Sequence, residues 1–362
     1  VVFEVVGGLN MQTGVGDIDL TGSSGLDFTE MGLSAGRDLI LNKLQVEVDD
    51  KFEAIAGRHV KAEGLDLDVA GENGSVTFKA GTAENAEDGD IDLSGAHIDG
   101  IGEAGAVGDA IFVAKDKVDM TSVLAETEDF SAQSLTVTAG GSLLLGEGPQ
   151  SVHTMNDIVL DAADLNGGLL AANSQLVSDA GSILIDLDSA QKGGLRIEDG
   201  VRIDAFKALS IRTAGTVAAT GNVMLTGNDS VGVLSGGDIV LQGAVVVGDE
   251  TVGERSADVT LEAKGAILQT VENGDGGIRA DALTAKAEDG SVVLGAGRTE
   301  VSAGNAFSNA VFESAGDVIA ASSGRDTSVR LRAGLSTATS SFTARTTRSA
   351  SSTTSASRAM RS

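Results

Sequence analysis

The stretch that decides the fold is ADVTLEAKGAILQTVENGDGGIRADALTAKAEDGSVVL, residues 257–294. In its first half Val259, Leu261 and Ala263 stand at alternate positions before Gly265, and the second half repeats this pattern before another glycine. Alternate residues of a strand share a face, so each run has one apolar face and one polar face. A glycine between two short strands indicates a bend. The stretch therefore reads as two strand–bend–strand units.

The unit recurs at a spacing typical of repeat proteins. Small or apolar residues stand six, four and two places before Gly141, Gly215 and Gly316, as they do before Gly265. From Gly265 to Gly290 to Gly316 the step is roughly 25 residues, within the range that indicates a solenoid. A β-sandwich with short strands is the alternative, but register and bend recur together. We therefore predict an all-β chain folded as a parallel β-helix (β-solenoid).

Composition narrows the classes of protein and partner. The 362 residues carry a formal net charge of −28, which argues against nucleic acid or an anionic membrane surface as a partner. The absence of Cys excludes disulfides and thiolate metal sites. Trp and Tyr are also absent, so we expect Val, Leu, Ile and Ala to fill a narrow core. No apolar run is long enough to span a membrane. Because the chain starts at Val1, we interpret it as an internal fragment of a longer protein.

Residues 1–335 read as one repeat shaft. Gly16–Leu20 and Gly89–Leu93 share the sequence Gly-Asp-Ile-Asp-Leu, with the isoleucine and leucine on one face. Ile183–Leu187 shows the same alternation and is predicted to direct its first, third and fifth residues inward. Gly237–Val247 is the most apolar stretch, which predicts a strand covered on both faces.

Two regions depart from the repeat. Residues 94–130 are less regular, with one strand expected at Ala110–Ala114 and an acidic outer loop at Glu126–Asp129. Residues 336–362 are rich in Ser, Thr, Ala and Arg and contain no acidic residue, so we expect a disordered C-terminal tail. This tail is either a linker or the frameshifted end of an open reading frame.

Four segments carry a family resemblance: LTVTAGGSLLL, ADVTLEAKGAIL, ALTAKAEDGSVVL and GDIVLQGAVVV. They resemble the repeats of filamentous haemagglutinin-like large exoproteins, which are bacterial adhesins exported by two-partner secretion. The resemblance covers roughly residues 10–332. It implies a right-handed parallel β-helix that forms a shaft extending from the outer membrane. The Asn-Pro-Asn signatures of the family's secretion domain are missing, as expected of an internal segment. Autotransporter passenger domains share the architecture and stay an alternative.

Pairs of aspartates are the most noticeable chemical motif. A spacing of two on a strand puts both carboxylates on the outer face. β-Helical polysaccharide lyases and hydrolases use carboxylates on such a face for acid–base chemistry or around calcium. We favour a solvated face that deters edge pairing, because the pairs recur in separate coils and aromatic sugar platforms are missing. The pairs are Asp17/Asp19, Asp66/Asp68, Asp90/Asp92 and Asp186/Asp188.

Other candidate sites are weaker. Gly274–Gly277 is the nearest match to a calcium-binding nonapeptide but does not recur. His59, His97 and His153 lie far apart in sequence, and we expect them to be surface residues. No Gly-x-Ser-x-Gly elbow or P-loop occurs. We therefore assign no catalytic, cofactor-binding or metal-binding residue and expect no enzyme.

The functional hypothesis is a structural and binding shaft of a secreted or surface-displayed bacterial adhesin. Its expected location is extracellular, at the outer membrane. Its expected partners are a host or neighbouring-cell surface and an outer-membrane transporter for export. Two alternatives are kept: a β-helical polysaccharide lyase or hydrolase, and the shaft of a contact-dependent toxin-delivery exoprotein.

Overall fold

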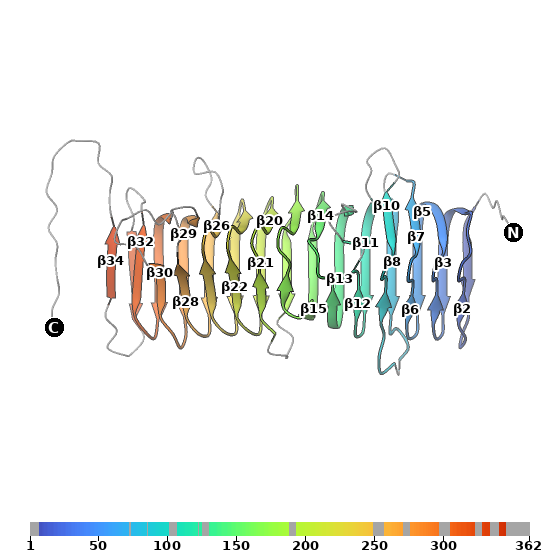
Figure 1. Ribbon diagram of the computed structural model, residues 1–362, viewed down its shortest axis with the longest axis horizontal. Helices are drawn as coiled ribbons and strands as arrows, with labels where there is room; N and C mark the ends of the chain where they lie inside the picture. Colours follow the sequence, from blue (N-terminus) through green and yellow to red (C-terminus); the bar gives the residue numbers. More distant parts are fainter. Residues whose placement is uncertain are drawn as a thin grey trace.

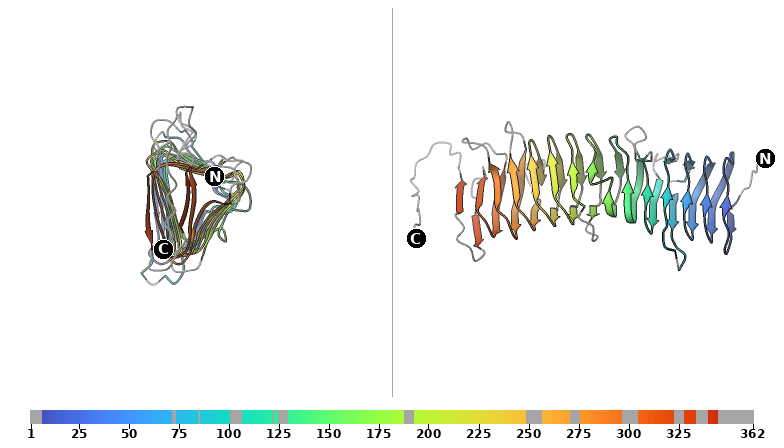
Figure 2. Two further views of the ribbon diagram at one scale, coloured as in Figure 1. Left: turned by 90° about the vertical axis from the view of Figure 1, so that its left-hand side faces the viewer. Right: turned by 60° about the horizontal axis from the view of Figure 1, so that its bottom comes forward.

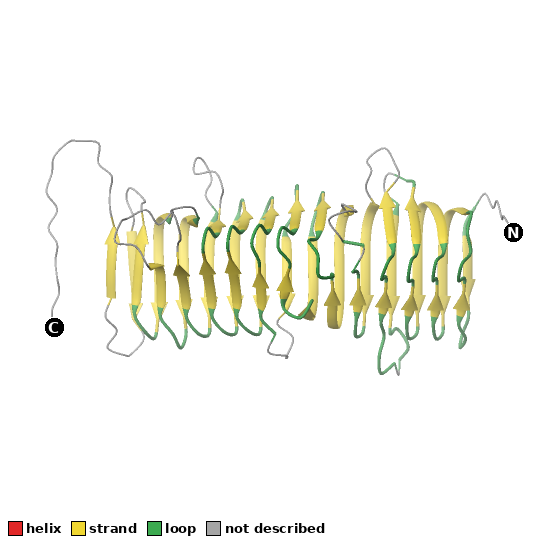
Figure 3. Ribbon diagram, in the orientation of Figure 1, coloured by secondary structure: helices red, strands yellow, loops and turns green. Residues whose placement is uncertain are grey.

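The computed structural model describes residues 7–71, 74–84, 86–100, 107–121, 123–124, 130–187, 193–248, 257–270, 276–296, 305–322, 328–333 and 340–344. These residues form strands and loops without a helix, so none forms a helix that could cross a membrane (Figure 3). The strands stack along one axis, from β2 at one end to β34 at the other (Figure 1). Every recorded strand pairing is parallel, which confirms the predicted β-helix.

The strands are, in chain order, β1 (Leu9–Gln12), β2 (Ile18–Asp19), β3 (Leu26–Ala35), β4 (Leu39–Ile40), β5 (Gln45–Ala56), β6 (Val60–Lys61), β7 (Asp66–Val69), β8 (Ser75–Ala80), β9 (Ile91–Asp92), β10 (His97–Gly100), β11 (Val107–Ala114), β12 (Val118–Asp119), β13 (Phe130–Leu144), β14 (Ser151–Thr154), β15 (Ile158–Leu165), β16 (Leu169–Leu170), β17 (Gln175–Ser178), β18 (Ile183–Leu187), β19 (Leu195–Ile197), β20 (Arg202–Ala205), β21 (Ala208–Thr213), β22 (Val217–Thr220), β23 (Met224–Gly227), β24 (Ser230–Ser235), β25 (Ile239–Gln242), β26 (Val246–Gly248), β27 (Asp258–Ala263), β28 (Ile267–Thr270), β29 (Gly277–Ala287), β30 (Val292–Ala296), β31 (Ala306–Ser314), β32 (Val318–Ser322), β33 (Ser328–Ala333) and β34 (Ser340–Ala344).

One column of paired residues runs the length of the shaft. Each member lies opposite the next on the neighbouring parallel strand, and all are apolar. The chain takes between 19 residues (Ala310 to Val329) and 34 residues (Val76 to Ala110) to return to the column. Coil length therefore varies while register is kept. The fourteen members are Leu9, Met31, Phe52, Val76, Ala110, Leu135, Ile158, Ile183, Leu209, Val231, Val259, Leu283, Ala310 and Val329.

The core is a narrow interior shared by all coils, with a roughly triangular outline in the end-on view of Figure 2. Seven of the ten phenylalanines are buried in it, so the expectation of an aliphatic interior is wrong in part. Phe78 lies 5.3 Å from Phe52 and 5.5 Å from Phe112 between ring centroids, in the N-terminal half. Phe78 and Phe112 occupy paired positions and their rings stack along the axis, whereas the rings of Phe52 and Phe78 are tilted by 41°.

The recurrent glycines are explained by the closeness of neighbouring coils. A β carbon added to Gly290 would lie 2.7 Å from the α carbon of Ala266 in the preceding coil. At Gly215 it would lie 2.8 Å from the carbonyl oxygen of Gly193. Neither glycine has a positive φ angle. The repeat therefore needs glycine at these bends because coils stack in contact there, and not because the backbone is left-handed.

The predicted facing of the strands is confirmed at most positions. Ile183, Ile185 and Leu187 are buried, and the expected strand at Ala110–Ala114 lies within β11. Gly237–Val247 is not a strand covered on both faces. It contains β25 and the start of β26, separated by a turn that includes Gly243 with φ 95°. Its apolar run reads as continuous because outward Val240 is also apolar.

Two predictions fall wholly or mostly outside the described residues. Glu126–Asp129, expected to be an outer loop, lies outside the described residues. Most of the tail does as well, but β34 lies inside the stretch expected to be disordered and pairs with β32. The β-solenoid therefore extends at least five residues into that stretch.

Candidate functional site

The first carboxylate of each Gly-Asp-Ile-Asp-Leu motif links one coil to the next. Asp17 Oδ1 accepts a hydrogen bond of 3.0 Å from the backbone N–H of Asp38. His59 Nδ1 accepts one of 3.3 Å from the N–H of Asp90, whose Oδ1 accepts one of 3.1 Å from the N–H of Lys117. These side chains therefore satisfy backbone donors at one corner of successive coils.

Two arginines hold the same corner. Arg37 donates from both Nε and Nη2 to the carboxylate of Asp17, the Nε bond being 2.7 Å. Arg58 does the same to Asp38, at 2.8 and 2.5 Å. The hydrogen bond from Arg37 holds the pKa of Asp17 at about 2, and that from Arg58 lowers the pKa of Asp38. Both carboxylates are thus kept as anions, which does not suit a general acid.

The second carboxylate of the motif closes a local turn. Asp19 Oδ1 accepts the N–H of Thr21 at 2.9 Å, and Asp92 Oδ1 accepts the N–H of Ser94 at 3.0 Å. Hydrogen bonds from Thr21 lower the pKa of Asp19. Such Asx turns are structural. The outward carboxylates of Asp17/Asp19 and Asp90/Asp92 therefore have structural partners.

Of the pair Asp66/Asp68, Asp66 pairs in register with Gln45 and His97, whereas Asp68 belongs to a column of four carboxylates that we call the acidic ladder. Asp27, Glu47, Asp68 and Asp99 pair in register on β3, β5, β7 and β10. Burial, followed by the neighbouring carboxylates, raises the pKa of Glu47 and of Asp68. His97 Nε2 lies 3.3 Å from Asp99 Oδ2 at one end. Here the chain places like charges side by side.

The pair Asp186/Asp188 is only partly described, because Asp188 lies outside the described residues. Asp186 pairs in register with Asp161, and burial followed by the charge of Asp186 raises the pKa of Asp161. Arg212 Nη1 lies 3.7 Å from Asp186 Oδ2 on the other side. Asp186 is therefore part of a column of charged side chains on the outer face, between Asp161 and Arg212.

The histidines do not converge. His153 is exposed, as predicted, and its Nε2 lies 2.8 Å from Asp179, whereas His97 is half-buried on the outer face. His59 is not a surface residue: its side chain is only 16% exposed, between Asp88 and Asp90. Within the described residues no group of three His, Cys, Asp or Glu side chains could hold a metal ion. Of the calcium candidate Gly274–Gly277, the first two residues lie outside the described part of the chain.

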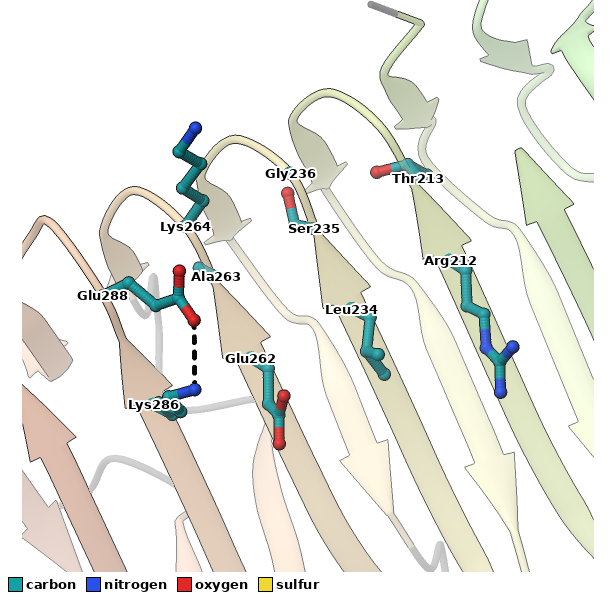
Figure 4. A pocket seen from close by; sticks show the side chains of 10 residues that line it. All are labelled: Arg212, Thr213, Leu234, Ser235, Gly236, Glu262, Ala263, Lys264, Lys286 and Glu288. Atoms are coloured by element: carbon teal, nitrogen blue, oxygen red, sulfur yellow. Dashed lines mark hydrogen bonds and ion pairs between the residues drawn. The ribbon is translucent and has the colours of Figure 1, made fainter. Parts of the chain in front are cut away.

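Sequence reasoning missed a hollow on the outer face of the long strands, which we call the charged groove (Figure 4). Its volume is about 260 Å³, and it extends across β21, β24, β27 and β29. Arg212, Leu234, Glu262 and Lys286 come from paired positions on these four strands. Aligning the strands by their buried residues would have found these four side chains, because each is an outward residue between two buried positions of its strand.

Positive and negative groups alternate in the charged groove. Lys286 Nζ donates to Glu288 Oε1 at 3.0 Å, and this bond raises the pKa of Lys286. Leu234, between charged neighbours, is 36% exposed. Donors, acceptors and an apolar side chain in a shallow hollow suit the binding of a polar extended ligand such as a saccharide chain. The lining residues hold no pair of nucleophile and base.

Comparison with known proteins does not identify a relative. No protein-family model matches the chain, and no characterised protein or solved structure is significantly similar to it.

Proposed function

We propose that this chain is a shaft segment of a secreted or surface-displayed bacterial adhesin. The observation that carries the proposal is the unbroken column of paired residues from Leu9 to Val329. Each coil adds one strand spacing of about 4.8 Å along the axis, so the molecule grows longer with each coil while its width stays the same. A rod of this kind holds a binding surface away from the cell that bears it.

The charged groove is the surface on which we expect contact with a host or neighbouring cell. It lies on the outer face and offers side chains from four successive coils. A partner that binds across four coils is itself extended, as a polysaccharide chain is. Export through an outer-membrane transporter by two-partner secretion follows from the sequence resemblance and is part of the same proposal.

An attachment assay tests the proposal. Beads coated with the chain are expected to bind bacterial or host cells, or surfaces bearing polysaccharide, more than beads coated with an unrelated acidic protein. Lys286→Ala should reduce binding. Lys51→Ala is a matched control, since Lys51 Nζ also pairs with a glutamate two residues on, at 3.1 Å, but on β5. Beads that bind none of these surfaces would contradict the adhesin role.

The acidic ladder supports a second candidate, a β-helical enzyme that cleaves polysaccharide. Raised pKa values at Glu47 and Asp68 are what a general acid needs. Release of reducing ends or unsaturated sugars from a polysaccharide panel, abolished by Asp68→Asn, would support it. A chain that leaves the whole panel intact eliminates it.

A further inference from the structure

One face of the shaft carries no charged side chain among the described residues of five successive strands. It belongs to the separate eight-stranded sheet and is formed by β22, β25, β28, β30 and β32. Ala218, Val240, Leu268, Val293 and Ile319 form a column in register on it. Leu268 and Ile319 are 37% and 44% exposed. The outward neighbours of this column are Thr220, Gln242, Thr270 and Gly295. We call these nine residues the neutral face.

The neutral face is unusual for this chain. In the N-terminal coils the strands at the equivalent place in the coil are β2, β4, β6, β9 and β12. Their outward side chains include Asp19, Lys61 and Asp92. At β19 the neutral face is bordered by an ion pair of 3.1 Å between Arg196 and Glu198. The charge is thus removed from one side of the shaft in the C-terminal half only.

The net charge indicates which partner this face fits. A second copy of the chain also carries −28, so most approaches bring carboxylates together. The neutral face is free of that repulsion. The side chains of its column repeat along the shaft at the strand spacing of about 4.8 Å, and those of another copy have the same period. We propose that two copies of this chain pack through their neutral faces, related by a two-fold axis.

The size of the neutral face sets the strength of this contact. Five strands spaced by about 4.8 Å, each with about four residues of 3.3 Å, cover roughly 300 Å² per copy. The total of roughly 600 Å² is below the 1,200 Å² of a stable interface, so the pair is weak. Repulsion between the acidic surfaces outside the neutral faces opposes this pairing, and salt screens that repulsion. Self-association therefore strengthens with salt, the opposite of an interface held by ion pairs.

Sedimentation of the 362-residue chain over a range of protein concentrations tests this pairing. In about 0.5 M salt the average mass is expected to rise with concentration, and in about 0.05 M salt to rise less. Leu268→Lys places a charge at the centre of the neutral face and should weaken association about tenfold or more. Leu234→Lys is the matched control, because Leu234 is 36% exposed against 37% for Leu268 but lies on another face.

Each outcome decides the proposal. Association that grows with salt, and is lost in Leu268→Lys but kept in Leu234→Lys, supports it. A wild-type chain that stays monomeric in high salt overturns it. Association that salt weakens, or that both variants lose equally, assigns the contact to another surface and overturns it too. Circular dichroism confirms that both variants fold. This pairing is independent of the attachment assay, so either proposal can fail alone.

Discussion

A buried pair of amides gives the sharpest test of the packing between coils. Gln269 on β28 and Asn305 before β31 are 2% and 0% exposed. Gln269 Nε2 donates to Asn305 Oδ1 at 3.0 Å, and Asn305 Nδ2 donates to Gln269 Oε1 at 2.8 Å. The backbone N–H of Ile278 also donates to Asn305 Oδ1, at 2.8 Å. Asn305 thus joins three segments of neighbouring coils.

Asn305→Leu removes three hydrogen bonds at once. The amide nitrogen and oxygen of Gln269 and the N–H of Ile278 lose the partner that Asn305 provides. At about 1–3 kcal/mol for each of these three buried groups, we expect a loss of about 3–9 kcal/mol. In the double variant Gln269→Leu/Asn305→Leu the Ile278 N–H still loses this acceptor, but the Gln269 amide is no longer buried without its partner. This variant removes the two unpaired Gln269 atoms, so it should be more stable than Asn305→Leu by about 2–6 kcal/mol, although it carries one more substitution.

Native-state hydrogen exchange is the assay, because a solenoid need not unfold in one step. Protection in β28, β29 and β31 should fall in Asn305→Leu and recover in the double variant. Protection in β3 and β5, at the other end of the shaft, should not change and acts as the internal control. A double variant less stable than Asn305→Leu would refute the reasoning, since it would mean that lost packing outweighs unpaired amides.

Three more predictions concern the core, the acidic ladder and the bends. Phe78→Ala should cost about 3–5 kcal/mol by emptying the ring stack, measured by urea unfolding; a loss below about 1 kcal/mol would show that the stack collapses freely. Glu47 and Asp68 have raised pKa values in the folded chain, so folding favours their protonated forms. The stability gained from these protons is present below about pH 4 and is lost as the pH rises through the folded-state pKa values. Asp68→Asn should therefore raise the free energy of unfolding by about 0.2–1 kcal/mol for each like-charge pair removed at pH 7 and leave it unchanged at about pH 3; an equal change at both pH values would exclude the electrostatic cause. Gly290→Ala should cost about 1–3 kcal/mol, because its methyl group meets the preceding coil, and a neutral effect on the melting temperature would contradict close stacking there.

The sequence predicts the repeat well and its exceptions poorly, for physical reasons. Val259, Leu261 and Ala263 are all buried, because alternation reports directly which side of a strand faces inward. Gly237–Val247 was misread because an apolar outward residue removes the alternation at Val240. His59 was misplaced because its partners, Asp88 and Asp90, belong to the next coil. Paired residues on neighbouring coils lie 19 or more positions apart in the sequence, and local patterns carry no information about their contacts.

The charged groove shows the same limit. Its four central side chains are paired by register, and each is unremarkable in its own strand. Aspartates of the Asp-x-Asp pairs are structural where they close turns or accept hydrogen bonds from the next coil. A repeated acidic motif in a solenoid is therefore a sign of stacking before it is a sign of catalysis. Outward residues that share one register position on successive strands are a better indication of a ligand site.

The variable coil length has a mechanical consequence. If the ends of the shaft are pulled apart, tension acts along the axis and separates whole coils, one neighbour pair at a time. A coil of roughly 25 residues that comes loose lengthens the chain by roughly 80 Å, against the 4.8 Å it occupied when stacked. Coils of 19 and 34 residues release different lengths. The shaft would thus give way in unequal steps and absorb load over a long extension before the chain becomes taut.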